Sequence, residues 1–440
     1  MIKTYISFLA IIITLTACGH KAEKLYSAKP GFYAYASGPI NSNGISAEHY
    51  SKVYATPASC QKVITALLAL KTLGPDYKFQ TSLLAVKKQN KIQDIIIKFS
   101  GDPTLSLDQL VELCGVLRNT KINGHIFIDA SAFGVLPYSH KLVIEDIGKA
   151  YCAPVGSVNI DRNIITANIY PGRIGGLAQI KLICNYPLNS GVATNHDKTS
   201  VILTWLDGVI HAAGNINIDQ KVLELKIAPQ NHDQYILHKI KALLASLNIN
   251  GKVKIIKDAQ QIPQQAKLIN THFSLPLVQI MQLAMASSDN LVFDSIYLSM
   301  IQQKSAAKIT HWENGNDIIH QLLKVHFNID AGNAIFVDGS GLSRYNKIQP
   351  SVLFELLKKG FYVQHFLDLL PKPGQENSTL KNRLNLASTI RAKTGNMSGI
   401  SCLCGYNLVS FHPTAFVVMA NSFAAPSREL FSLMDNFVSQ

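Results

Sequence analysis

The order of apolar and polar positions changes character twice along this chain of 440 residues. Residues 59–72 are apolar at most positions, and Pro57 before them and Gly74 after them are typical signals that start and stop a helix. The pattern therefore predicts one largely buried helix there. Similar signals predict elements on both sides of the middle of the chain: strands over 31–36, 334–337, 388–393, 402–409 and 414–420, and helices over 275–303 and 427–438.

Between residues 78 and 265 short β-rich runs alternate with turns that contain glycine, asparagine and proline. Such a region between two helix-rich segments indicates an insertion with its own core, large enough for two nested subdomains. The predicted fold is α/β (α+β), with a helix-and-sheet domain from residues 19–77 and 266–440 that is interrupted by residues 78–265. The insertion is predicted to hold strands over 94–99, 125–128, 164–169 and 200–206, and helices over 107–117 and 234–247.

The first 18 residues predict a signal peptide. Lys3 precedes an apolar run of about ten residues, which fits a secretory signal and is too short to span a bilayer of roughly 30 Å. Leu15-Thr16-Ala17-Cys18 closes the run and resembles a bacterial lipobox, which implies a lipid anchor on the Cys18 sulfur. Ordinary cleavage near Ala17, with Cys18 incidental, is the alternative. Both alternatives predict export to the periplasmic side of the cell envelope.

Composition excludes some classes of protein. Hydrophobic residues make up 47% of the chain and charged residues 16%, which is typical of a globular protein and not of a disordered one. The net charge of +13 is spread over separate lysines. It suits an anionic polymer such as peptidoglycan or an anionic membrane, and a generally lysine-rich composition explains it equally well. No arginine-rich patch with interleaved aromatic residues indicates a nucleic-acid partner.

The cysteines fix no disulfide pattern, and no motif predicts a metal. Of seven cysteines, six follow Cys18, and an exported protein permits disulfides, but the spacing leaves every pairing open. Cys402 and Cys404 lie two apart in a predicted strand, so we expect them to share a face and to pack as small apolar residues. The sequence has no H-E-x-x-H or C-x-x-C motif, and we predict neither a metal site nor a cofactor.

Three short motifs occur in this order along the chain: S-x-x-K, S-D-N and K-T-G. They are Ser59-Cys60-Gln61-Lys62, Ser288-Asp289-Asn290 and Lys393-Thr394-Gly395. S-x-x-K alone should occur by chance roughly once or twice in a lysine-rich chain of this length, so it indicates little by itself. All three strings together, each in a suitable context, are far more specific.

The first string predicts a nucleophile and its base. A serine hydroxyl is a poor nucleophile at neutral pH and needs activation. Lys62 lies three residues after Ser59, on the same side of the predicted helix, and a buried lysine has a lowered pKa, so it can act as a base in its neutral form. We therefore predict Ser59 as nucleophile and Lys62 as base. An exposed serine and lysine on a surface helix is the alternative, which the apolar surroundings disfavour.

The second string supplies polar groups for the same reaction. Ser288 is expected to pass a proton to the departing amine, and Asn290 is expected to hold Lys62 and to bind the substrate amide. The alternative is a helix-initiating cluster, because serine, aspartate and asparagine are good N-caps.

The third string predicts a binding strand. Lys393 and Thr394 are expected to bind a substrate carboxylate, and Gly395 to let the substrate backbone approach an edge strand. An ordinary cationic strand end is the alternative. The backbone N–H groups of Ser59 and Asn396 are expected to form the oxyanion hole.

The residues from Pro57 to Lys62 resemble the P-A-S-x-x-K opening of the class C low-molecular-mass penicillin-binding proteins, which are D-alanyl-D-alanine carboxypeptidase/endopeptidases with the same three strings. The long insertion between Ser59 and Ser288 also resembles this family more than ordinary serine β-lactamases. The resemblance covers nearly the whole mature chain. Further matches are Gly74-Pro75-Asp76, Gly101-Asp102-Pro103-Thr104-Leu105, Ala153-Pro154, Asp161-Arg162-Asn163 and the loop of residues 338–344, D-G-S-G-L-S-R.

The resemblance implies a transpeptidase/β-lactamase-like domain, with an antiparallel sheet flanked by helices. It implies that peptidoglycan stem peptides are the substrates, that Lys393 and Thr394 bind the carboxylate of a D-Ala-D-Ala end, and that β-lactams trap Ser59 covalently. It does not separate carboxypeptidase from endopeptidase, because both activities present a D-centre after the scissile bond.

The resemblance also implies contacts to the diaminopimelate side chain of the stem peptide. Asp146 is expected to pair with its ammonium group and Arg344 with its carboxylate, with Tyr151 beside them; a solvated aspartate and a structural arginine are the alternative. The chain departs from the family at Cys60-Gln61, where Thr-Met is usual and where Cys60 should point into the core, and at residues 374–380, where G-x-D-G-T-L is usual.

Two other functions stay open at this point. One is a catalytically weak peptidoglycan-binding scaffold with the same fold, which the intact strings disfavour. The other is a penicillin-hydrolysing or esterase relative, which the long insertion disfavours.

Overall fold

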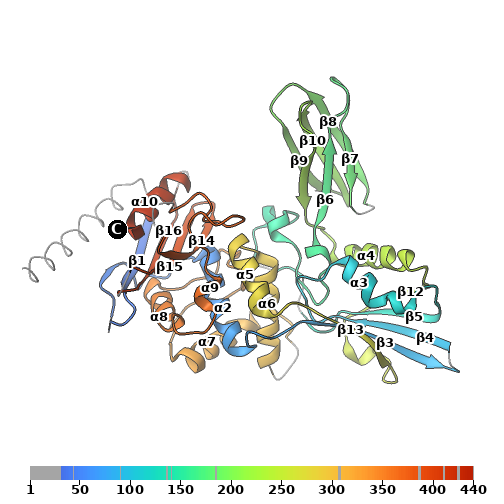
Figure 1. The fold of residues 1–440 in the computed structure, drawn as a ribbon, viewed down its shortest axis with the longest axis horizontal. Coiled ribbons are helices and arrows are strands. Elements are labelled where there is room, and N and C mark those ends of the chain that lie inside the picture. Colours follow the sequence, from blue (N-terminus) through green and yellow to red (C-terminus); the bar gives the residue numbers. More distant parts are fainter. Residues whose placement is uncertain are drawn as a thin grey trace, which may run out of the picture.

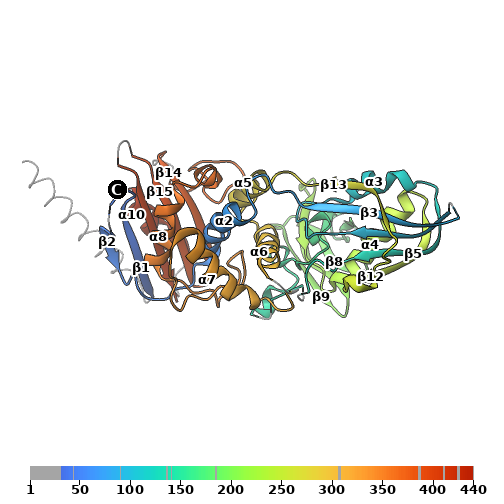
Figure 2. The same ribbon diagram turned by 90° about the horizontal axis from the view of Figure 1, so that it is seen from below.

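The structure, a computed structural model, describes residues 31–439 except residues 43, 90, 135–136, 140, 184–185, 306–308, 385–387, 410–411 and 424–426. The predicted signal peptide, with Cys18, lies outside the described residues. Figures 1 and 2 show two lobes side by side, one that carries both ends of the described chain and one that is formed by the middle of the chain.

An antiparallel sheet forms the centre of the first lobe, with the strand order β14-β15-β16-β1-β2. β1 pairs with β16 along its whole length, from Phe32 opposite Asn421 to Pro39 opposite Thr414, so the two ends of the chain close one sheet. β14, which carries the K-T-G string, lies at the edge of this sheet. The strands are β1 (Phe32–Pro39), β2 (Ala47–His49), β14 (Ile390–Met397), β15 (Ile400–Asn407) and β16 (Thr414–Asn421).

Helices cover both faces of this sheet, so the predicted fold class is confirmed. One face packs on a large apolar cluster from most of the helices, and the other face packs on α10. α2 is buried at every position from Gln61 to Leu70, as expected of the central helix that the apolar pattern predicts. The helices are α2 (Gln61–Thr72), α5 (Leu277–Ser287), α6 (Asn290–Lys304), α7 (Asn314–Phe327), α8 (Pro350–Gly360), α9 (Phe366–Leu369) and α10 (Ser427–Ser439).

The second lobe contains a five-stranded sheet with the order β12-β5-β4-β3-β13. β5 pairs in parallel with both β4 and β12, and parallel strands need crossover connections, which contain α3 and α4 here. The sheet and the two helices enclose a separate apolar core. The elements are β3 (Gln80–Lys88), β4 (Lys91–Lys98), α3 (Leu107–Cys114), β5 (Lys121–Asp129), α4 (His232–Ser246), β12 (Asn250–Ile256) and β13 (Lys267–Phe273).

A further set of strands lies between β5 and α4 in the chain and projects from the second lobe (Figure 1). Two three-stranded sheets, β11-β6-β7 and β8-β10-β9, enclose a core of their own. The predicted domain boundaries, 77/78 and 265/266, stay a prediction. Strand β13 begins after the second boundary but pairs with β3 in the sheet of the second lobe. The strands are β6 (Ile165–Tyr170), β7 (Gln179–Leu182), β8 (Leu188–Asn195), β9 (Ser200–Leu206), β10 (Val209–Asn217) and β11 (Leu223–Ile227).

Two predicted elements differ from the structure. The single helix predicted over 275–303 is two helices, because the chain turns at Ser288, which has a left-handed backbone with φ of 61°. The strand predicted over 334–337 is wrong, since only Ile335 forms an isolated bridge, with Lys347. No helix in the described part of the chain is long and apolar enough to cross a membrane.

The cysteines that the structure describes are all free and buried. Cys60, Cys402 and Cys404 belong to the large apolar cluster of the first lobe, which confirms their predicted packing in the core. Cys184 lies outside the described residues. The free described cysteines are Cys60, Cys114, Cys152, Cys402 and Cys404.

Candidate active site

Ser59 lies in a 3₁₀ turn, Ala58–Cys60, directly before α2 and not within the α-helix as the pattern predicted. Ala58 has φ of 47°, a left-handed backbone that costs roughly 1–3 kcal/mol for a residue with a side chain. A Cβ atom at Gly341 would overlap with the Ala58 carbonyl oxygen, and one at Gly395 would lie 2.8 Å from the Ser59 nitrogen. Glycine at these two positions therefore lets a loop and strand β14 pack directly against the nucleophile.

The Lys62 side chain is fully buried and has three oxygen neighbours. Its Nζ lies 2.9 Å from Ser59 Oγ, 2.7 Å from Asn290 Oδ1 and 2.6 Å from the carbonyl oxygen of Ser340. The amide and carbonyl oxygens can only accept hydrogen bonds, whereas the serine hydroxyl can also donate one. A neutral Lys62 therefore donates to the two acceptors and keeps its lone pair for the Ser59 proton.

Electrostatics favours this neutral form of Lys62. Burial is the largest influence and holds the pKa of Lys62 well below its ordinary value, and the positive charge of Lys393 lowers it further. The carboxylates of Asp294 and Asp338 oppose these effects, but the net direction is downward. Lys62 can therefore serve as a general base at neutral pH.

Two buried carboxylates fasten the loop that presents the Ser340 carbonyl oxygen. Asp294 Oδ1 accepts hydrogen bonds from the backbone N–H groups of Gly339 and Ser340, at 3.0 and 2.7 Å. Asp338 accepts two further backbone N–H groups of the same loop, both at 2.7 Å. This loop, D-G-S-G-L-S-R, thus supplies an acceptor to Lys62 from its backbone.

The S-D-N string lies at the break between α5 and α6. Ser288 ends α5, and the Asp289 side chain caps α6 by accepting a hydrogen bond from a backbone N–H of its first turn. Asn290 begins α6, where its Oδ1 accepts from Lys62 and its Nδ2 donates to the Tyr151 carbonyl oxygen at 2.8 Å. The string therefore both caps a helix and places an amide at Lys62, so its two interpretations are compatible.

Lys393 is buried on β14, close to Ser288. Its Nζ donates hydrogen bonds to Ser288 Oγ at 2.9 Å and to the carbonyl oxygen of Thr394 at 2.6 Å. Burial lowers the pKa of Lys393 to about 8, against the smaller opposing influence of Cys60 and Cys404. Lys393 therefore stays positively charged at neutral pH. It lies beside the Ser288 hydroxyl, which is expected to protonate the leaving amine.

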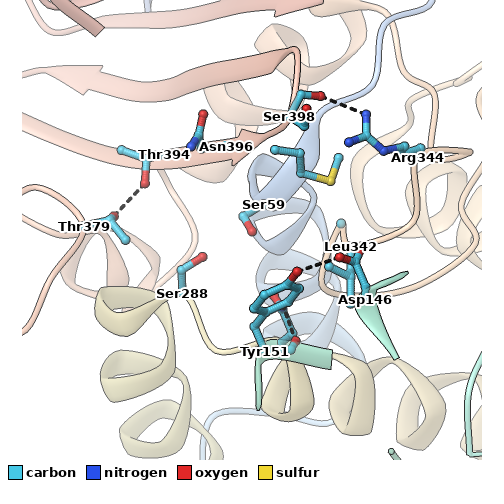
Figure 3. Close-up of a pocket in the computed structure, with 13 residues that line it drawn as sticks. Ser59, Asp146, Tyr151, Ser288, Leu342, Arg344, Thr379, Thr394, Asn396 and Ser398 are labelled. Carbon is cyan, nitrogen blue, oxygen red and sulfur yellow. Dashed lines mark hydrogen bonds between the residues drawn. The ribbon is translucent and has the colours of Figure 1, made fainter. Parts of the chain in front are cut away.

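These groups surround a cavity of about 420 Å³. Figure 3 shows Ser59 near its middle, with Ser288, Thr379 and Thr394 along one wall and Asp146 and Arg344 along the opposite wall. Lys62, Lys393 and Gly395 do not line the cavity, because they lie buried behind its surface. Eight predicted residues line it: Ser59, Asp146, Tyr151, Ser288, Asn290, Arg344, Thr394 and Asn396.

The wall expected to contact diaminopimelate contains one acidic and one cationic side chain. Asp146 accepts a hydrogen bond from the Tyr151 hydroxyl at 2.6 Å, and Arg344 Nη1 donates to the carbonyl oxygen of Ser398 at 2.9 Å. Burial, and then Asp146, raise the pKa of Tyr151 to about 12, so its hydroxyl stays a neutral donor. The structure brings the three residues together at the cavity, with their protein partners already in place.

Several residues of the site belong to none of the predicted motifs. Thr379 lines the cavity and accepts a hydrogen bond from the Thr394 hydroxyl at 2.6 Å; it comes from the segment that departs from the family spacing. Leu342, Met397 and Ser398 also line the cavity. Asp294 had a signal in the sequence, since it follows Asn290 by four residues and so shares its helix face.

A sequence model of the D-Ala-D-Ala carboxypeptidase 3 (S13) family matches residues 22–440. The D-alanyl-D-alanine carboxypeptidase DacB of Haemophilus influenzae is 29% identical over 423 residues, which cover 89% of this chain and 85% of that protein. The D-alanyl-D-alanine carboxypeptidase of an Actinomadura species is 26% identical over 406 residues, which cover 84% of this chain and 74% of that protein.

Solved structures show the same similarity. Penicillin-binding protein 4 of H. influenzae matches with a TM-score of 0.83 at 25% sequence identity, over 95% of this chain and 98% of that one. A second structure of that protein contains a β-lactam. A predatory endopeptidase of Bdellovibrio bacteriovorus shares the fold with a TM-score of 0.54 at 16% identity, over 93% of this chain and 92% of that one.

Proposed function

The chain belongs to the D-Ala-D-Ala carboxypeptidase 3 (S13) family, and we propose that it cleaves peptidoglycan stem peptides through an acyl intermediate on Ser59. It is a serine-type D-Ala-D-Ala carboxypeptidase/endopeptidase, homologous to penicillin-binding protein 4. The observation that supports the assignment of Ser59 is its contact with Lys62 Nζ, whose other two partners are both obligate acceptors.

Acylation begins when neutral Lys62 takes the proton of Ser59 while Oγ bonds to the carbonyl carbon of the penultimate D-Ala. The carbonyl oxygen gains negative charge, for which the backbone N–H groups of Ser59 and Asn396 are the expected donors; loss of one such donor typically lowers the rate on the order of 10²–10³-fold. The C–N bond then breaks, and Ser288 gives a proton to the departing amine. Protonated Lys62 then replaces the proton on Ser288, so Lys62 is neutral again and, in net terms, one proton has moved from Ser59 to the amine.

Deacylation requires water, which bonds to the ester carbon and releases the stem peptide as a free carboxylate, while Ser59 Oγ regains a proton. Thr394 and Lys393 bind the carboxylate of the terminal residue during acylation, Thr394 from the wall that also carries Ser288 and Lys393 through its positive charge from behind that wall. In this arrangement the leaving residue would lie beside the Ser288 hydroxyl, the proposed proton donor.

β-Lactams should acylate the same serine. The H. influenzae relative has been observed with a bound β-lactam. In this chain the penicillin carboxylate would bind at Lys393 and Thr394, and its strained amide would take the place of the D-Ala-D-Ala peptide bond. We infer that penicillin inhibits the enzyme by forming a slowly hydrolysed ester with Ser59.

We also propose that the protein acts at the periplasmic side of the envelope, anchored through lipid on Cys18. The apolar run from Ile6 to Leu15 and the lipobox-like residues 15–18 support this location. A Cys18→Ala variant should move from the membrane fraction to the soluble periplasmic fraction. Wild-type protein found in the soluble fraction, with an unmodified N-terminus by mass spectrometry, would contradict the anchor.

The test of the proposed function is mass spectrometry of the purified protein after exposure to penicillin, with Ser59→Ala as the control. We expect a stable adduct on the peptide that contains Ser59 in the wild type and none in the variant. Digestion of purified muropeptides then measures carboxypeptidase and endopeptidase activity. Well-folded wild-type protein that neither forms an adduct nor consumes penicillin would reject the mechanism and favour a peptidoglycan-binding scaffold.

A further inference from the structure

A second cavity, of about 720 Å³, lies between α5, α9 and strand β14. The packed helices α5 and α9 are seen beside β14 in Figure 1. Unlike the active site, this cavity carries no part of the three strings, and the mechanism above does not use it. Its polar lining residues are Gln282, His365, Asp368, Lys372, Gln375 and Arg391.

The second cavity and the active site share no lining residue, but the same two elements, β14 and α5, carry residues of both sites. Arg391 precedes Lys393 by two residues on β14, so the two side chains share a face of the strand and lie about 7 Å apart. Gln282 precedes Ser288 by six residues along α5, or about 9 Å. The segment between the cavities folds back on itself, because the Gly374 N–H donates to the carbonyl oxygen of Leu380 at 3.0 Å.

The wall of the active site that lies on the side of β14 and α5 is the one expected to receive the leaving residue. Figure 3 shows Ser288, Thr379 and Thr394 together on one side of Ser59. In the proposed function, Lys393 and Thr394 bind the carboxylate of the residue after the scissile bond. If that residue belongs to a crosslink, it carries a second stem peptide, which must extend beyond this wall. A separation of about 7–9 Å is the length of two to three extended residues.

The chemistry of the second cavity suits a peptide that is rich in carboxylates. Lys372 is exposed and Arg391 half-buried, and Asp368 is the one acidic side chain among the lining residues. Arg391 uses one terminal nitrogen, Nη1, for the carbonyl oxygens of Ser388 and Ile390, so further N–H groups of its guanidinium remain for a ligand. The free carboxylates of a stem peptide are the matching groups.

We propose that this second cavity, lined by Lys372 and Arg391, binds the leaving stem peptide of a crosslinked substrate through its carboxylates. The inference rests on the proposed function and deepens it, because it assigns a site to the second chain of a crosslink. With this second cavity, the chain would have a binding site for the hydrolysis of crosslinks as well as for the removal of terminal D-Ala.

The test compares two substrates, a purified crosslinked muropeptide dimer and a monomeric peptide that ends in D-Ala-D-Ala. Lys372→Glu and Arg391→Gln should each lower kcat/KM for the dimer about tenfold, mainly through KM, because each removes a charged contact to the substrate. For the monomer they should change kcat/KM less than about twofold. Asp368→Asn should lower KM for the dimer, since it removes the one opposing charge. Lys267 is an exposed lysine on β13, far from both cavities. Lys267→Glu makes the same charge change as Lys372→Glu and serves as the control.

The outcomes separate the inference from the proposed function. Equal effects on dimer and monomer, or no effect on either, would overturn the inference while the wild type still forms the Ser59 adduct. Efficient cleavage of the monomer with no cleavage of the dimer by wild type would also overturn it. A wild type that cleaves neither substrate and forms no adduct would reject the proposed function itself.

Discussion

Arg162, in the second lobe, forms an ion pair with Asp289, the middle residue of the S-D-N string. The Asp289 side chain is only 5% exposed, and it also caps α6. One carboxylate thus joins the inserted region to the backbone between Ser288 and Asn290. Asp161, the residue before Arg162, accepts a hydrogen bond from Lys239 Nζ of α4 at 2.5 Å. This contact anchors the segment that carries Arg162 in the second lobe.

Arg162 should therefore be a positioning residue for acylation. We expect Arg162→Ala to lower the rate constant for acylation by a fluorescent penicillin on the order of 10²-fold, because a displacement of about 1 Å in Ser288 or Asn290 can have such an effect. The melting temperature should also fall, because the Asp289 carboxylate, only 5% exposed, loses its cationic partner, but the folded protein should remain the major form.

The control for this prediction is Lys257→Ala, which breaks the exposed ion pair between Lys257 and Asp233 in the same lobe. It should leave acylation unchanged. Asp289→Asn combined with Arg162→Ala should be no slower than the slower single variant, because both remove one interaction. Additive effects, or a rate loss that parallels a loss of folded protein, would mean that Arg162 acts on stability alone.

Asp294 should influence the pKa of Lys62, the proposed general base. Its carboxylate raises the pKa of Lys62, and burial and Asp338 in turn raise the pKa of Asp294, so the two groups compete for a proton. Asp294→Asn keeps an oxygen for the N–H groups of Gly339 and Ser340 but removes the charge. The pKa of Lys62 should then fall, and the rising limb of the acylation rate against pH should move to lower pH.

The comparison for this prediction is Asp294→Ala, which also removes the acceptor. It leaves two buried N–H groups without a partner, at about 1–3 kcal/mol each, and frees the Ser340 carbonyl oxygen from its place at Lys62. We expect this variant to lose stability and most of its acylation rate. A pH profile of Asp294→Asn that matches the wild type would show that Asp294 acts only as a hydrogen-bond acceptor.

Much of the fold could be predicted from local patterns, and so could the residues that bear the motifs. The apolar run of α2 predicted its burial, and the spacing of Ser59 and Lys62 predicted their common side, because helical periodicity is a local property. The acceptor at Ser340 could not be found this way, since a backbone carbonyl has no signature in the sequence. Thr379 and Arg162 reach the site by tertiary contacts, which local patterns do not encode.

The helix break at Ser288 was missed by the prediction of a single helix over 275–303, although the alternative for the S-D-N string, a helix-initiating cluster, indicated a helix start there. Its neighbourhood has no proline or glycine, the residues that usually end a helix. The left-handed backbone of Ser288 is held instead by its surroundings, through Lys393 at its side chain and Arg162 at the next residue. Tertiary contacts thus override the helical pattern at the position where the chemistry needs an exposed hydroxyl.

Deprotonation of Lys393 should cause kcat/KM for a D-Ala-D-Ala peptide to fall at alkaline pH. Its pKa is lowered to about 8 by burial, and the carboxylate of the substrate needs its positive charge. As the pH rises through about 8 the charge is lost, so kcat/KM for a D-Ala-D-Ala peptide should fall. Lys393→Arg should remove this fall because arginine stays charged. A penicillin with its carboxylate esterified is the control, because its weaker acylation should show no such fall; a profile flat up to pH 10 with the peptide substrate would contradict the assignment.

His232 should make the second lobe sensitive to acid. Burial lowers its pKa from 6.5 to about 4, so the unfolded chain binds more protons than the folded one between these values. Stability should therefore fall as the pH drops from about 6.5 to about 4, by on the order of 3 kcal/mol, and this contribution should be constant above that window. His232→Phe removes the titration, so urea unfolding at pH 7 and pH 5 should differ less than in the wild type. His196→Asn, at an exposed position, should keep the wild-type difference. An unchanged acid sensitivity in His232→Phe would assign the acid sensitivity to groups other than His232.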